Sequence, residues 1–516
     1  LNIAQEADII VKNLTNGNNS TTSNIINIAG ITTTLTSGKY IKNSYNKGNI
    51  VVANIQNQFS NIYVAGLVNH NYSGDLHNQD GSTQPKATVG IINSVNYGDI
   101  TSTLNSSTYG ILGRGNVFAG GLATSNRGSI QDSINHGNIT LYNSLAYRAP
   151  VYTYHWWYGY QLSEPGTVTF SIDSEEGGLV LNYEGGLIIG GVVSFIGSGD
   201  SRVYDTSNGG NIIGLSNNFV RSGGIVGNVL LQELTAGNAG NYGTSTIPES
   251  IISNGINYGS VLAITSNIGT YGTGSGSSGN QTLYYSGSGS GTYYMPATTI
   301  ATQERPGIHA SSGGVIAYGL SEMRRMINHG LVVSTDVAGG VVGATFVSNS
   351  SRRTYVKLET AINYGSVRAY KSDNFNNFNK VTFSLDNLET NLYATNDDFI
   401  FPTALQNNYE DMKRFPQHKR GIGGVFGRLQ RGLNNYMIGD GTSNSQFDFI
   451  VNMDPNVDLI GRLDQVYNFT SSLRFFSFGN SKYYSARKND TTQGVFTGFY
   501  FREGGNRNTP RYITTP

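Results

Sequence analysis

The chain has no cysteine, which excludes disulfide scaffolds, thiolate metal sites and cysteine nucleophiles. Charged residues are also scarce, at 13% of 516 residues, and the 33 basic residues cancel the 33 acidic ones. A chain without surplus positive charge has little to attract nucleic acid or anionic lipid by counterion release. Nucleic acid is therefore not an expected partner.

Long apolar runs are missing as well. The longest, Gly186–Gly197, has 12 residues and is interrupted by Gly190 and Gly191, so it is too short to cross a bilayer. The sequence starts at Leu1 without a basic-then-apolar leader, which predicts a mature or trimmed fragment. No transmembrane segment is expected in it.

Glycine and asparagine are in excess. Glycine supplies 67 residues, and asparagine accounts for about one residue in nine. Such a composition often marks disorder, but 38% of the chain is hydrophobic and 11% is aromatic. Much of this material is Ile, Val, Tyr and Phe, which favour half-buried strands, so the composition predicts a folded all-β protein.

Two short patterns recur along the chain. The first is a pair of small residues before an aliphatic one, as in Gly120-Gly121-Leu122, and the second is Asn-X-Gly, as in Asn135-His136-Gly137. Copies of the first pattern include Gly30, Gly66, Gly224, Gly314, Gly340 and Gly424, and copies of the second begin at Asn46, Asn96, Asn257, Asn328 and Asn363. Repetition of this kind determines the architecture of a chain.

The repeat predicts short strands joined by sharp corners, because its apolar runs are too short for helices and are separated by turn-forming residues. Gly314 and Gly340 lie 26 positions apart, about one coil of a solenoid. We therefore expect a right-handed parallel β-helix (β-solenoid) with irregular coils, in which asparagine and serine stack in ladders at the corners.

Residues 119–139 resemble the GLUG motif of bacterial surface proteins, which reads Gly-Gly-apolar, Asn-X-Gly-X-Ile and Ser-apolar-X-X-Gly-X-apolar. The other copies, between about residues 25 and 370, match this motif at their two ends. The resemblance implies β-helical adhesins and other cell-surface or secreted proteins, mycoplasma types included. It implies an extracellular or surface location and brings no catalytic residues with it.

Interruptions of the repeat divide the chain. Residues 1–370 are predicted to form the solenoid, with surface insertions at 141–185 and 269–297, and the Gly/Ser/Tyr-rich segment 269–294 is interpreted as a loop or tether. Residues 371–420 are predicted to be an insertion with a short helix over 404–415, capped by Thr403. Residues 421–516 are predicted to form the last coils and an aromatic C-terminal cap.

One insertion supplies the candidate binding residues. If residues 147–160 are extended, alternation places five aromatic residues of the run on one face, as a stacking platform for a glycan or a docking strip for a partner. The alternative is that they pack over the solenoid flank or a neighbouring chain. The candidate ligand- or partner-binding residues are Tyr152, Tyr154, Trp156, Trp157, Tyr158 and Tyr160.

Two polar loops carry residue types that bind metals, but neither has a recognisable ligand spacing. They contain His70, Asp75, His77 and Asp80 in one case, and Asn452, Asp454, Asn456 and Asp458 in the other. Simple solvation is the favoured interpretation, so neither a metal nor a cofactor is expected. His329 occupies the variable X position of the repeat, which argues against a catalytic triad.

The sequence therefore predicts a non-enzymatic bacterial protein, structural or adhesive, at the cell surface or outside the cell. Its expected partners are a host-surface glycan or protein, or other subunits of a surface assembly or filament. The alternative is a glycan-cleaving β-helix enzyme of the lyase, hydrolase or tailspike kind, which needs a pair of suitably spaced carboxylates.

Overall fold

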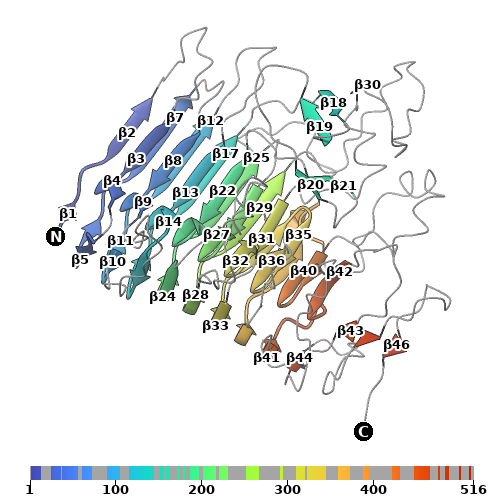
Figure 1. The fold of residues 1–516 in the computed structure, drawn as a ribbon. Helices are drawn as coiled ribbons and strands as arrows, with labels where there is room; N and C mark the ends of the chain where they lie inside the picture. The colour runs from blue at the N-terminus through green and yellow to red at the C-terminus, as the bar shows by residue number, and fades with distance from the viewer. Residues whose placement is uncertain are drawn as a thin grey trace, which may run out of the picture.

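The protein is a parallel β-solenoid, which confirms the predicted fold class (Figure 1). The computed structural model describes residues 2–12, 25–36, 38–55, 61–72, 90–104, 116–143, 186–196, 201–216, 220–229, 251–265, 310–319, 322–344, 358–371, 388–393, 421–430, 447–464 and 483–486, and eight strands of three smaller sheets. Each full coil contributes strands to four long parallel sheets, here numbered 1 to 4 in chain order.

The four sheets consist of short strands. Sheet 1 contains β1 (Ala4–Gln5), β6 (Tyr45–Asn46), β11 (Val95–Asn96), β16 (Ile134–Asn135), β24 (Arg202–Asn208), β28 (Ile251–Asn257), β33 (Glu322–Asn328), β37 (Leu358–Asn363), β41 (Phe447–Asn452) and β44 (Tyr483–Ser485), with β5 (Ile41–Lys42), β10 (Gly90–Ile92) and β15 (Ser129–Gln131) beside them. Sheet 2 contains β2 (Ile9–Lys12), β7 (Ile50–Ile55), β12 (Ile100–Leu104), β17 (Ile139–Asn143), β25 (Ile212–Ser216), β29 (Val261–Thr265), β34 (Val332–Ser334) and β38 (Val367–Ala369). Sheet 3 contains β3 (Ile26–Ala29), β8 (Ile62–Ala65), β13 (Val117–Gly120), β22 (Leu187–Gly190), β26 (Val220–Gly223), β31 (Ala310–Gly313), β35 (Val337–Gly339) and β39 (Gly421–Gly423). Sheet 4 contains β4 (Thr32–Leu35), β9 (Val68–Asn71), β14 (Ala123–Asn126), β23 (Val193–Ile196), β27 (Val226–Val229), β32 (Ile316–Tyr318), β36 (Val342–Ala344), β40 (Phe426–Gln430) and β42 (Ile460–Asp464).

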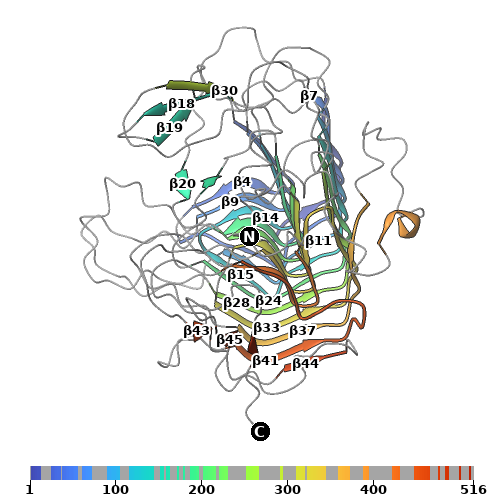
Figure 2. The same ribbon diagram turned by 90° about the vertical axis from the view of Figure 1, so that its right-hand side faces the viewer.

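The two largest clusters of the core each lie between a pair of sheets. Buried residues of sheets 1 and 4, such as Ile91 and Val68, form one cluster, and buried residues of sheets 2 and 3, such as Ile50 and Ile62, form another. In each coil, sheet 1 packs against sheet 4 and sheet 2 packs against sheet 3. The two packed pairs meet at an angle, as Figure 2 shows in the view along the stack. Sheets 1 and 2 join at the Asn-X-Gly corner, and sheets 3 and 4 join at the Gly-Gly corner.

An asparagine ladder runs through the Asn-X-Gly corner, as predicted. In every rung but the last, Nδ2 donates to Oδ1 of the next asparagine, over 2.8 to 3.2 Å, and to the carbonyl of the glycine two positions on. Asn452, the last rung, donates instead to the Asp454 and Val457 carbonyls. The members are Asn46, Asn96, Asn135, Asn208, Asn257, Asn328, Asn363 and Asn452. Successive members lie 35 to 89 positions apart in the sequence, so coils of very different length keep one register.

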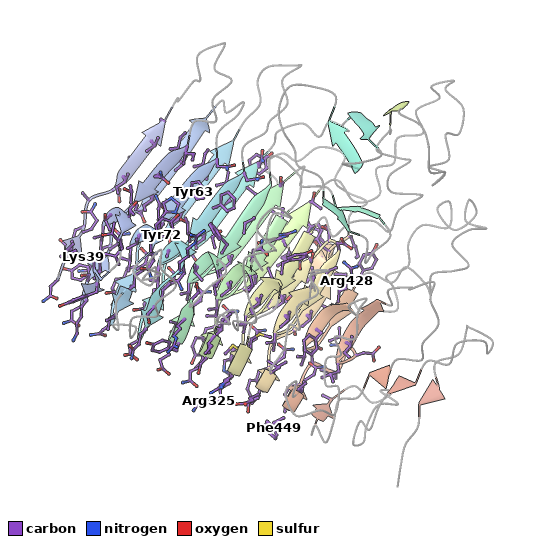
Figure 3. The ribbon with its side chains drawn as sticks, in the orientation of Figure 1. Lys39, Tyr63, Tyr72, Arg325, Arg428 and Phe449 are labelled. Atoms are coloured by element: carbon purple, nitrogen blue, oxygen red, sulfur yellow. The ribbon has the colours of Figure 1, made fainter. Side chains whose placement is uncertain are left out.

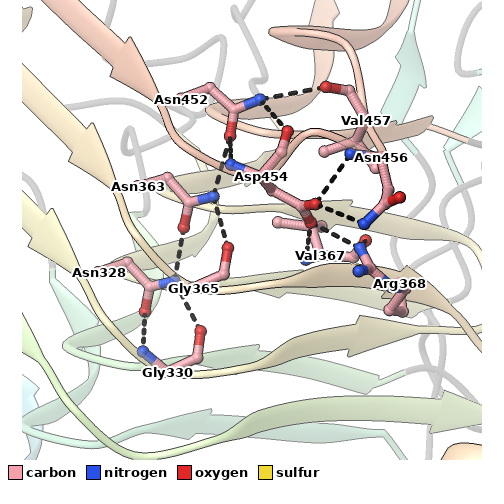
Figure 4. A network of polar contacts seen from close by, with 10 residues as sticks. All are labelled: Asn328, Gly330, Asn363, Gly365, Val367, Arg368, Asn452, Asp454, Asn456 and Val457. Atoms are coloured by element: carbon pink, nitrogen blue, oxygen red, sulfur yellow. Dashed lines mark hydrogen bonds and ion pairs between the residues drawn. The ribbon is translucent and has the colours of Figure 1, made fainter. Parts of the chain in front are cut away.

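Just beyond the last rung, Asn452, the Asp454 side chain closes sheet 2 (Figure 4). In the preceding coils the first N–H of each sheet 2 strand donates to a carbonyl of the next coil, as Val332 does to Ser366. The Val367 N–H donates instead to Asp454 Oδ2 over 2.7 Å, and Arg368 Nη1 lies 2.6 Å from the same oxygen. The carboxylate therefore takes the place of a further strand.

A second column of residues marks a kink in sheet 1, where the backbone is left-handed with φ between 45° and 61°. Asparagine and aspartate tolerate this conformation best, and they occupy the first five rungs. The column consists of Asn43, Asn93, Asp132, Asp205, Asn254, Arg325, Thr360 and Phe449. Figure 3 labels Arg325 and Phe449 along the edge of the coils that this column follows.

The remaining described strands lie outside the four sheets. They are β18 (Val151–His155), β19 (Gly159–Leu162) and β30 (Gly291–Tyr294) in one sheet, β20 (Ser171–Asp173) and β21 (Gly178–Val180) in a second, and β43 (Phe475–Phe476), β45 (Phe499–Tyr500) and β46 (Arg511–Tyr512) in a third. A 3-10 helix spans Glu389–Asn391. The prediction of a loop over 269–294 was wrong for its last four residues, which form β30, and the predicted helix 404–415 lies outside the described residues.

Candidate functional site

The side chains at the X position of Asn-X-Gly form an exposed row along the outer edge between sheets 1 and 2, here called the corner ladder. Each X residue donates its N–H to the carbonyl of the Asn, or in the first coil Gln5, on the preceding coil, over 2.7 to 2.9 Å, so the row is held in register. The corner ladder consists of Lys47, Tyr97, His136, Gly209, Tyr258, His329, Tyr364 and Met453.

The rings of the corner ladder are stacked. Tyr258 and His329 have centroids 5.1 Å apart with planes at 4°, and His329 and Tyr364 lie 4.9 Å apart at 6°. Tyr97 and His136 form a second stack at 5.3 Å and 14°. These distances follow the spacing of hydrogen-bonded strands, because each ring stands on its own coil.

The stacked tyrosines are solvent-exposed although they are large and aromatic. Tyr97, Tyr258 and Tyr364 expose 49%, 57% and 51% of their surface. Beside them on sheet 1, two positions earlier in each coil, runs a half-buried row that is mostly aliphatic, including Val95, Ile134, Ile256, Ile327 and Ile362. The corner ladder and this aliphatic row run side by side along the solenoid as an apolar strip, which Ser207 and Gly209 interrupt on one coil.

A second group of rings, here called the inner cluster, lies where the outer faces of sheets 3 and 4 meet. Tyr63 and Phe118 stack at 4.7 Å and 8°, and Tyr63 meets His70 edge-on at 5.0 Å. His70 Nε2 lies 3.0 Å from Asn27 Oδ1. Burial raises the pKa of Tyr63 and lowers the pKa of His70, since both groups are partly removed from water.

His70 gives the fold a predicted pH dependence. Because burial lowers its pKa, the native state holds His70 neutral while the unfolded chain takes up a proton near the ordinary value of about 6.5. At a pH above about 6.5, His70 therefore does not reduce the free energy of unfolding. As the pH falls below this value, only the unfolded chain gains the proton, and the free energy of unfolding decreases. In a series of thermal unfolding midpoints between about pH 5 and 8, His70→Gln should lose less stability on acidification than the wild type. Equal slopes for the two proteins would show that His70 carries none of the pH dependence.

No family model, curated protein or solved structure matches the chain. The GLUG resemblance therefore stays a prediction, and the function is inferred from the geometry of these surfaces. Among the described residues, none forms a helix able to span a membrane.

The predicted aromatic strip is not one extended strand. The chain reverses between β18 and β19, which pair antiparallel so that Tyr154 lies opposite Tyr160 and Tyr152 opposite Leu162. β30 pairs with the other edge of β18, opposing Tyr293 to Tyr152. A row along a single strand was therefore the wrong geometry, because a local hairpin pairing with β19 and a long-range pairing with β30 fold the segment into a small sheet. Trp156, Trp157 and Tyr158 lie outside the described residues.

The metal-loop candidates have structural partners. Asp454 is paired with Arg368, and Asn452 is the last rung of the asparagine ladder. Asn456 donates through Nδ2 to Asp454 Oδ1 over 3.1 Å. Of the other loop, only His70 belongs to the described residues, among which no group of three metal-binding side chains occurs.

The sequence did contain a signal for the corner ladder. The X position is aromatic or histidine in Tyr97, His136, Tyr258, His329 and Tyr364, although nothing in an isolated turn requires a ring there. Within one repeat this position is simply an exposed turn residue, and its stacking emerges only when successive coils are superposed.

Proposed function

We propose that the protein is a non-enzymatic binding protein of a bacterial surface or the extracellular space, and that the corner ladder is its binding surface. The observation that carries the proposal is the stack of Tyr258, His329 and Tyr364, parallel within 6° and exposed along a ridge. Surface location is supported by the GLUG-like repeat.

Pre-organisation makes these rings suitable for binding. Ordering a free side chain at an interface costs conformational entropy, but stacked rings on a hydrogen-bonded ladder have already lost much of that freedom. Tyrosine also offers a large apolar face together with a polar hydroxyl, which suits both glycans and protein surfaces. The partner proposed for this ridge is a host-surface glycan or protein that extends along several coils.

A cell-binding assay tests the proposal. Fluorescently labelled wild type is compared on intact host-type cells with the triple variant Tyr258→Ala/His329→Ala/Tyr364→Ala, which we expect to bind about tenfold more weakly or worse. Tyr40→Ala is the matched control, since Tyr40 is 49% exposed but lies outside the corner ladder.

Equal binding by the triple variant and the wild type would refute the ladder as the binding surface. Release of shortened glycan from the cells would instead favour the glycan-cleaving alternative. An antibody to the chain, applied to intact producing cells, tests the location independently.

A further inference from the structure

Between Tyr97 and Tyr364, one coil of the corner ladder has no ring. Gly209 occupies the X position between His136 on one neighbouring coil and Tyr258 on the other. The backbone register is unbroken there, because Gly209 N–H donates to the Asn135 carbonyl over 2.7 Å and Tyr258 N–H donates to the Asn208 carbonyl over 2.8 Å. The backbones of His136 and Tyr258 therefore lie two strand spacings apart, roughly 9.5 Å.

Measured along the stack of coils, the gap is wide enough for one ring. Where rings occupy adjacent rungs, their centroids are 4.9 to 5.3 Å apart, so a ring placed midway between His136 and Tyr258 would stack on both at about the same distance. The floor is bare backbone, and His136 leans over it: a Cβ added at Gly209 would lie 3.1 Å from His136 Nδ1.

The same coil differs in the aliphatic row as well. Ser207 stands in register with Ile134 on one side and Ile256 on the other, which puts a hydroxyl where the neighbouring coils have an aliphatic side chain. Ser207 and Gly209 share the outer face because they are two positions apart, Ser207 near the end of β24 and Gly209 directly after it. The edge of the gap on sheet 1 is therefore polar.

The opposite edge of the gap is also polar. Asn211 follows Gly209 around the corner, and its Oδ1 accepts a hydrogen bond from Ser260 N–H over 3.0 Å. Its backbone N–H donates to Asn138 Oδ1 over 2.9 Å. Among the hydrogen bonds within the described chain, the Asn211 side chain uses only its oxygen, which leaves Nδ2 to donate to a ligand.

We infer that the gap at Gly209 binds one pyranose ring of a glycan. The two faces of the sugar ring stack on His136 and Tyr258, and its hydroxyl groups meet the Ser207 hydroxyl and the Asn211 amide. An aromatic side chain of a partner protein would use the two rings but would leave both polar edges without a hydrogen bond, which disfavours it as the occupant. The inference rests on the proposed function, since it names the ligand class and the position at which the corner ladder binds it.

Two variants close the gap by copying neighbouring coils. Gly209→Tyr supplies the ring found at Tyr97, Tyr258 and Tyr364, and His136 has to move by only a few tenths of an ångström to admit it. Ser207→Ile supplies the side chain found at Ile134 and Ile256 and leaves the glycine in place. The introduced tyrosine and isoleucine already occur at the equivalent positions of neighbouring coils, so both variants are expected to fold. A thermal unfolding midpoint equal to that of the wild type is the control for folding.

The experiment is a glycan array followed by titration of the saccharide that the wild type binds best. We expect Gly209→Tyr to lower the affinity at least about tenfold, and Ser207→Ile to lower it several-fold, because the first excludes the ring and the second removes one hydrogen bond. Undiminished affinity of a folded Gly209→Tyr variant overturns the inference. If Gly209→Tyr does not fold, undiminished affinity of the Ser207→Ile variant overturns the inference. The inference is also overturned if the wild type binds no saccharide on the array.

The triple ladder variant separates this inference from the proposed function. If it loses cell binding while Gly209→Tyr retains full binding to cells and saccharide, the ladder is a binding surface and the sugar site at Gly209 is wrong. If the triple variant also retains full binding to both, the proposed function is wrong as well.

Discussion

Replacing Gly224 with alanine is expected to lower the free energy of unfolding by about 4 kcal/mol or more. Gly224 lies at the corner between sheets 3 and 4, where its Cα faces the next coil. An added methyl group would overlap the carbonyl oxygen of Gly314 and would lie 2.5 Å from Cγ of Asn257 in the asparagine ladder. The carbonyl belongs to the backbone and cannot rotate away, so the coils would have to separate. Urea-induced unfolding, followed by circular dichroism, measures the loss.

Gly255→Ala is the matched control for this substitution. Gly255 is also buried, in β28, but a methyl group there would meet the Met326 sulfur at 3.3 Å, at the flexible end of a side chain. We expect the free energy of unfolding to change by less than about 1 kcal/mol. Equal losses for Gly224→Ala and Gly255→Ala would show that the close contact between coils at the Gly-Gly corner is not what requires glycine.

Asn257→Asp is the second substitution with a large expected effect, about 3 to 5 kcal/mol at neutral pH. Asn257 Nδ2 donates to Asn328 Oδ1 over 2.8 Å and to the Gly259 carbonyl over 2.7 Å. A carboxylate has no hydrogen to donate, so both acceptors lose their donor and face a buried negative charge. The unfolding midpoint in urea reports the loss, and acidification should recover part of it by protonating the new carboxyl group.

Asn93→Asp provides the control with the same chemical change. Asn93 lies in the left-handed column, where its Nδ2 donates to Asn43 Oδ1 in an exposed hydrogen bond, and aspartate already occupies this column at Asp132 and Asp205. The expected change is below about 1 kcal/mol. A loss as large as that of Asn257→Asp would mean that the burial of the asparagine ladder is not the source of the effect.

The solenoid could be predicted because its constraints are local and repeated. Glycine is required wherever one coil touches the next through backbone, as at Gly224, and asparagine is required where an amide must both donate and accept, as at Asn257. Each requirement leaves a residue in the sequence once per coil. The pairing of the sheets into two cores leaves no comparable mark, since buried Val and Ile look alike in all four sheets.

Features that depend on distant partners could not be predicted. Asp454 was weighed as a metal ligand and interpreted as part of a solvated loop, whereas it is buried against Arg368, a partner that lies 86 positions earlier in the sequence. The aromatic run at 147–160 was expected to be extended, and the sequence showed neither its local reversal between β18 and β19 nor its pairing with β30, which joins residues more than a hundred positions apart. The corner ladder was missed for a related reason: each ring is unremarkable in its own turn, and Tyr258, His329 and Tyr364 become one surface only through the register of three coils.

The most direct measurement compares the two aromatic surfaces in one assay. Binding of labelled protein to intact host-type cells is titrated for the wild type, for Tyr258→Ala/His329→Ala/Tyr364→Ala, and for Trp156→Ala/Trp157→Ala in the segment that the sequence singled out. If the corner ladder is the binding surface, the ladder variant loses binding about tenfold or more while the tryptophan variant retains it. The opposite result, with binding lost only in the tryptophan variant, would contradict this assignment and place the binding surface on the insertion.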